Sequence, residues 1–99
     1  MTTVFTPAEG QPGAAKWLMA EFRDSEDALF DPDTITSIEI LNADGSVNET
    51  FETGWEKVST GIYRLAYNLP EGQLYIWHVW NIVNGGISDK RAHRINIKK

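Results

Sequence analysis

Apolar and polar residues alternate along most of this chain, and clusters of glycine, proline, asparagine and aspartate interrupt the alternation at short intervals. A period of two residues is typical of strands, whose successive side chains point to opposite faces of a sheet. The pattern predicts strands over 16–23, 35–41, 47–51, 55–58, 62–69, 74–83 and 87–97. The first is short enough that a helix is an alternative there. No stretch has sustained helical periodicity, and there is no internal repeat.

The segment 74–83 is dense in β-branched and aromatic residues and is bounded by turn-forming residues on both sides. This composition predicts the central strand of a sheet. Both of its faces are apolar, since one row is Tyr75, Trp77, Val79 and Val83 and the other is Leu74, Ile76, His78, Trp80 and Ile82. A two-layer domain covers only one face of such a strand, so we expect a loop, an N-terminal arm or another protein chain to cover the other.

Seven or so short strands separated by turn signals predict an all-β fold, an antiparallel β-sandwich. The length suits an immunoglobulin-like topology. A small barrel of the oligonucleotide-binding type is the alternative, which the acidic balance and the lack of a helical segment disfavour. Two prolines and two glycines between residues 7 and 13 predict an N-terminal arm or linker over 1–15, followed by the sandwich domain over 16–99.

Three stretches, 38–45, 59–70 and 72–80, resemble immunoglobulin-like modules of tailed-phage structural proteins and bacterial surface proteins. The first contains an aspartate-glycine hairpin, the second a threonine-glycine-x-tyrosine strand and a leucine-proline turn, and the third an aromatic strand led by glycine. The resemblance in strand and turn order extends over 22–97. The chain departs from antibody domains because it lacks both cysteines of their core disulfide.

This resemblance implies a non-catalytic structural module that presents a surface or joins an assembly, in a phage virion or at a bacterial cell surface. It also implies that Tyr75, Trp77 and Val79 fill the core, as aromatic residues of this strand do in that family. The opposite row is then left for a partner, so the predicted partner-binding residues are Leu74, Ile76, Trp80 and Ile82. The expected partners are protein subunits of a larger assembly, with self-association included.

Composition narrows the classes of function. With 99 residues the chain is one domain, and with no cysteine it has neither a disulfide framework nor a thiolate site. A net charge of −5 argues against a broad nucleic-acid surface, although basic residues gather near the C-terminal end. No segment approaches the roughly 20 apolar residues of a membrane span, and no signal peptide is visible. We therefore expect neither nucleic acid nor membrane as a partner.

Candidate chemistry is sparse. His78 and His93 are the only histidines, and two histidines without a nucleophile or carboxylate signature specify no reaction, so a structural role is favoured. The acidic run at Asp24, Glu26, Asp27, Asp31 and Asp33 lacks the spacing of a calcium loop. We expect Asp31 or Asp33 to accept backbone hydrogen bonds in turns instead. The sequence thus predicts no enzyme activity, no metal and no cofactor.

Four tryptophans make carbohydrate binding the alternative function, because sugar rings stack on exposed indoles. The candidates for such a platform are Trp17, Trp55 and Trp80, and the competing interpretation places them in the core or at a protein interface. The triplet Asn48-Glu49-Thr50 fits the glycosylation pattern, which arises often by chance, and we expect it to be unused.

Overall fold

The structure is a computed structural model that describes residues 9–10 and 15–97. Apart from Glu9, Gly10 and Ala15, the predicted arm over 1–15 lies outside the described residues, which contain eight strands and no helix. In chain order the strands are β1 (Glu9–Gly10), β2 (Ala15–Glu21), β3 (Thr34–Leu41), β4 (Val47–Phe51), β5 (Glu56–Ser59), β6 (Ile62–Asn68), β7 (Tyr75–Asn84) and β8 (Ile87–Ile97).

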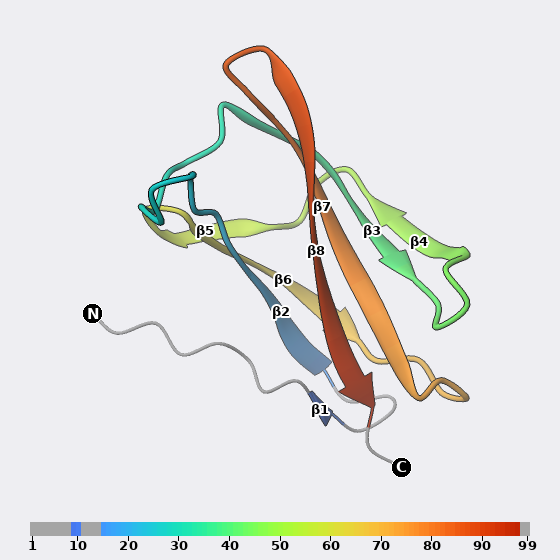
Figure 1. Ribbon diagram of the computed structural model, residues 1–99. Coiled ribbons are helices and arrows are strands. Elements are labelled where there is room, and N and C mark those ends of the chain that lie inside the picture. Colours follow the sequence, from blue (N-terminus) through green and yellow to red (C-terminus); the bar gives the residue numbers. More distant parts are fainter. Residues whose placement is uncertain (1–8, 11–14, 98–99) are drawn as a thin grey trace.

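Two sheets pack face to face as a β-sandwich (Figure 1). One sheet has five strands in the order β1-β8-β7-β3-β4, and the other has three in the order β2-β6-β5. All strand pairs are antiparallel except β1, which runs parallel to β8. Strands β2, β6 and β5 take the places of strands B, E and D of an immunoglobulin domain, and β8, β7 and β3 those of G, F and C. The fold class predicted from the sequence is confirmed.

Strand β7 is central, as predicted, because it pairs with β8 along one side and with β3 along the other. The turn between β3 and β4 is the expected hairpin, in which Gly45 has a φ of 91° and donates its N–H to the carbonyl of Asn42 at 2.9 Å. A positive φ favours glycine, so the Asp44-Gly45 motif is a reliable local signal.

The predicted assignment of the two faces of β7 is wrong. Ile76 and Trp80 have 0% exposure, and Ile82 has 2%, so this row fills the core instead of meeting a partner. The reason is the strand register, because Trp80 lies opposite Ile38 and His78 lies opposite Ile40 on β3. Residues directly opposite each other point to the same face of a sheet. The two isoleucines face the other sheet, and they carry the row of Trp80 inward with them.

The core between the sheets is built mainly from aliphatic side chains around two large rings. Phe22, which follows β2, packs edge-on against Trp80 with ring centroids 6.0 Å apart and against Tyr63 at 5.5 Å. Leu18, Ala20 and Phe22 have no exposed surface, so this face of the predicted first strand points inward. The helix alternative for that segment is excluded, because β2 pairs with β6 along seven residues.

The acidic segment between β2 and β3 forms turns. The Asp31 carboxylate accepts hydrogen bonds from the Gly61 N–H at 2.8 Å and from the Lys57 ammonium at 2.7 Å. Asp33 accepts the Gly85 N–H at 2.9 Å. These contacts confirm the expectation that Asp31 and Asp33 cap turns. The lysine and the backbone N–H lower the pKa of Asp31 below its usual value, since both stabilise the charged form.

Candidate functional site

The candidate site is the face of the five-stranded sheet that points away from the core, which we call the outer sheet face. Strand β7 contributes Tyr75, Trp77 and Val79 to it, because these residues alternate with the buried row. The strands beside β7 place the remaining residues there through direct pairing. Leu41 and Arg94 lie opposite Trp77, Glu39 and Ala92 lie opposite Val79, and Ser37 and Lys90 lie opposite Asn81.

At one end of the outer sheet face two rings and a guanidinium form a cluster. The Tyr75 and Trp77 rings meet edge to face, with centroids 6.5 Å apart and an interplanar angle of 86°. The guanidinium carbon of Arg94 lies 5.0 Å from the centroid of the Tyr75 ring, within the range of a cation–π contact. Both aromatic residues are half-buried and Arg94 is exposed. This cluster offers apolar area and a charged donor on one rigid strand pair.

Toward the other end, the outer sheet face becomes polar. The Asn81 amide nitrogen donates to Glu39 Oε1 at 2.9 Å and to Ser37 Oγ at 3.1 Å. The Lys90 ammonium lies 4.0 Å from the same Glu39 oxygen. Val79, which lies between Glu39 and Ala92 on the neighbouring strands, is only 7% exposed. The face therefore has an aromatic cluster at one end and hydrogen-bonded polar side chains toward the other.

Three of the four predicted partner-binding residues do not lie on a surface. Ile76, Trp80 and Ile82 are in the core, as shown above, and Leu74 precedes β7 with 62% of its surface exposed. The sequence does contain a signal for the row of β7 that points away from the core, and that signal is Asn81. This polar residue shares its row with Tyr75 and Trp77, and a buried row rarely includes an amide without a partner in the core.

The two histidines lie side by side, with His78 buried and His93 half-buried. His78 and His93 lie opposite each other on β7 and β8, with ring centroids 5.2 Å apart. The Trp80 indole N–H donates to His78 Nδ1 at 2.8 Å, so His78 acts as an acceptor and carries its proton on Nε2. Burial, together with the neighbouring His93, lowers the pKa of His78 to about 3. Burial is also the main cause that lowers the pKa of His93.

Among the described residues no three histidine, aspartate or glutamate side chains are grouped closely enough to hold a metal ion. Within the described core, His78 satisfies the buried indole N–H of Trp80.

The tryptophans proposed as a sugar platform are not brought together. Trp80 is in the core, and Trp55 is half-buried and packs against the core. Trp17 is 42% exposed on the outer face of the three-stranded sheet, where the guanidinium carbon of Arg64 lies 3.9 Å from its ring centroid. Asn48 of the glycosylation triplet is exposed on β4, and its amide nitrogen donates to the Tyr67 hydroxyl at 3.2 Å.

Comparisons with protein-family models, with curated proteins and with solved structures find no match to this chain. In the part of the chain that the structure describes, there is no helix long and apolar enough to cross a membrane. The fold class is therefore defined by strand order and pairing.

Proposed function

We propose that this domain is a non-catalytic structural module that docks on protein subunits of a larger assembly through its outer sheet face. The assembly we propose is a phage virion, with the domain as a capsid or tail accessory, or a bacterial surface structure. The observation that carries the proposal is the row of Tyr75 and Trp77 on the outer face of a central strand. In soluble domains, large aromatic residues on an outer sheet face commonly mark a binding surface.

The chemistry of the cluster supports a protein partner. Tryptophan, tyrosine and arginine are the residues that most often dominate the binding energy of protein interfaces, and Trp77, Tyr75 and Arg94 are adjacent here. Strands β3, β7 and β8 hold these side chains in a continuous hydrogen-bonded sheet, so little conformational entropy is lost when a partner binds. A module of this kind needs no catalytic group or cofactor.

Site-specific photo-cross-linking in the cells or particles that contain this protein tests the proposal. We expect a photoreactive amino acid at Trp77 to give an adduct with one particular protein. The same amino acid at Met19, which alternates with buried residues on the outer face of the three-stranded sheet, serves as the matched control. The absence of an adduct at position 77, or the same adducts at both positions, would contradict docking through this face.

Carbohydrate binding is the alternative function, and a glycan titration of the isolated protein tests it. Titration with a glycan panel, read by tryptophan fluorescence, is expected to give no saturable change. A sugar-dependent change that disappears in Trp77→Ala or Trp17→Ala, while both variants stay folded, would replace the proposed function with a lectin-like one.

A further inference from the structure

A second candidate binding surface is the free edge of β6, which belongs to the three-stranded sheet. Strand β5 pairs with β6 only at Ile62, Tyr63 and Arg64. Beyond Arg64, residues 65–68 pair with β2 on one side and have no strand on the other among the described residues. An exposed strand edge presents backbone donors and acceptors that can pair with another chain.

The register shows which backbone groups point to this edge. Phe22 donates its N–H to the Gly61 carbonyl at 2.7 Å, so these two residues, which extend the β2–β6 register by one step, are a pair joined through the backbone. Such pairs alternate with pairs whose backbone groups point away from each other. Ala66 and Asn68, opposite Trp17 and Ala15, are therefore of the second kind. Their N–H and C=O groups face the free edge.

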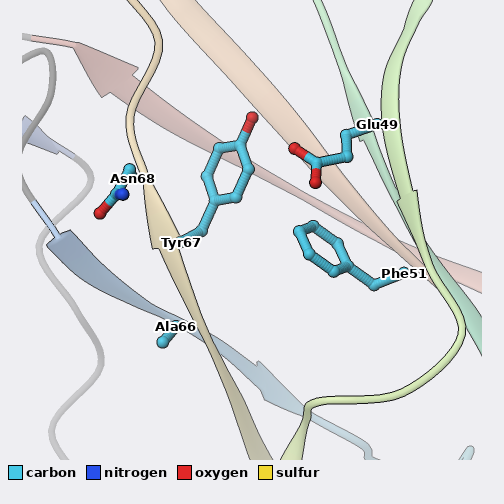
Figure 2. Close-up of a pocket in the computed structure, with 5 residues that line it drawn as sticks. All are labelled: Glu49, Phe51, Ala66, Tyr67 and Asn68. Atoms are coloured by element: carbon cyan, nitrogen blue, oxygen red, sulfur yellow. The ribbon is translucent and has the colours of Figure 1, made fainter.

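A cleft of about 280 Å³ lies along this edge, between β6 and β4, and is lined by Glu49, Phe51, Ala66, Tyr67 and Asn68. Figure 2 shows the Phe51 and Tyr67 rings on facing strands, with the Glu49 carboxylate beside them. The rings meet edge to face, with centroids 5.9 Å apart and an interplanar angle of 88°. Burial and the Glu49 charge raise the pKa of Tyr67. The cleft thus combines a strand edge, an aromatic wall and one negative charge.

We propose that this cleft binds residues 2–6 of a second copy of the chain as an added strand. The segment lies outside the described residues, and its sequence is Thr-Thr-Val-Phe-Thr, followed by Pro7. Threonine, valine and phenylalanine favour strands. It contains no acidic residue in a chain of net charge −5, so Glu49 does not repel it. Backbone pairing with Ala66 and Asn68 supplies affinity. An apolar side chain of the segment, packed against the Phe51 and Tyr67 rings, supplies specificity.

The strand order assigns the segment to a second copy. Strand β1, which follows the segment, is at the opposite edge of the five-stranded sheet from β4. Four strand spacings separate these edges, about 19 Å at the usual spacing. From Thr6 to Glu9 the chain spans at most about 10 Å. A contact between different surfaces of two copies is head-to-tail, so it continues from copy to copy. It uses neither Tyr75 nor Trp77, and it stands or falls separately from the proposed docking function.

Two full-length variants test this inference. Phe5→Asp places a negative charge where the aromatic wall and Glu49 disfavour it, and so disables the donor segment. Ala66→Pro removes one N–H from the free edge and so disables the acceptor cleft. Proline is tolerated there because this N–H does not take part in the β2 ladder. Ala66→Ser keeps the N–H and is the matched control, and a thermal unfolding scan verifies that each variant is folded.

Sedimentation velocity at protein concentrations up to about 1 mM measures the molecular mass of each variant. This range includes dissociation constants at the weak end of specific association. We expect the mass of the wild type and of Ala66→Ser to rise with concentration to more than twice that of the monomer. Phe5→Asp and Ala66→Pro should each remain monomeric, and an equimolar mixture should form a dimer and stop there, because it contains one working donor and one working cleft. A monomeric wild type overturns the inference, as does association of either variant alone or failure of the mixture to form dimers.

Discussion

Replacing Trp80 by alanine is expected to lower the free energy of unfolding by about 3–5 kcal/mol, which is the usual cost of deleting a large buried ring. Trp80 is fully buried, contacts Phe22, and donates its indole N–H to His78. The substitution leaves a cavity between the sheets and removes the donor for His78 Nδ1. Because a domain of this size has a total stability of about 5–15 kcal/mol, the substitution should remove a large share of it.

The matched control is Trp77→Ala, which differs only in the face of β7 that it changes. Trp77 is half-buried on the outer sheet face, so its loss should cost about 1 kcal/mol, as for most substitutions outside a core. Urea denaturation of both variants gives the comparison. Equal losses, or a larger loss for Trp77→Ala, would mean that the two rows of β7 have been assigned to the wrong faces.

The second large effect that we expect is a loss of folding stability in mild acid. The pKa of His78 is lowered to about 3 in the folded protein because the ring is buried next to His93. The unfolded chain binds a proton near the ordinary value of about 6.5, so stability is complete above that pH and is lost as the pH falls from there toward 3. At about pH 5 the difference of 1.5 pKa units corresponds to about 2 kcal/mol.

Urea denaturation at about pH 7.5 and about pH 5 measures this loss. Carboxylates contribute little in that window, since the stabilisation from groups such as Asp31, Asp44 and Asp89, whose pKa values are lowered, is lost only at lower pH. His78→Gln keeps an acceptor for the Trp80 indole N–H and does not titrate, so its loss should be smaller. The loss that remains in this variant comes from His93. Its pKa is lowered overall, because burial and Arg91 lower it more than Glu21 raises it. Unchanged wild-type stability at the two pH values would contradict a buried His78 that is uncharged in the folded protein.

The strands and turns of this domain could be predicted because they depend on local patterns. The alternation of Ile38 and Ile40 with polar residues identified β3 and its inward face, and both isoleucines are fully buried. The Asp44-Gly45 motif identified the hairpin that follows, because glycine alone tolerates that backbone conformation easily. The capping roles of Asp31 and Asp33 followed from the preference of aspartate for turns.

The row of β7 that faces the core could not be predicted in the same way, since both rows are apolar and alternation alone does not distinguish them. The distinction comes from pairing with Ile38 and Ile40, which are about 40 residues away in sequence and are fully buried. The resemblance to aromatic strands of other sandwiches favoured the wrong row. Asn81, a polar residue in the row of Trp77, pointed to the correct one.

The β6 cleft was also beyond the sequence, because it exists only where β5 ends before β6 does. Local patterns predict that both strands form, but their pairing stops at Arg64 because β5 begins only at Glu56, which lies opposite it. The free backbone groups of Ala66 and Asn68 follow from the short length of β5 and from the pairing with β2.

Hydroxyl-radical footprinting of the tryptophans, in the isolated protein and in its native assembly, tests the central claim most directly. In the isolated protein Trp77 should be oxidised and Trp80, with 0% exposure, protected. In the assembly Trp77 should become protected, while Trp17 on the other sheet keeps its reactivity. Oxidation of Trp77 to the same extent in both states would contradict docking through the outer sheet face.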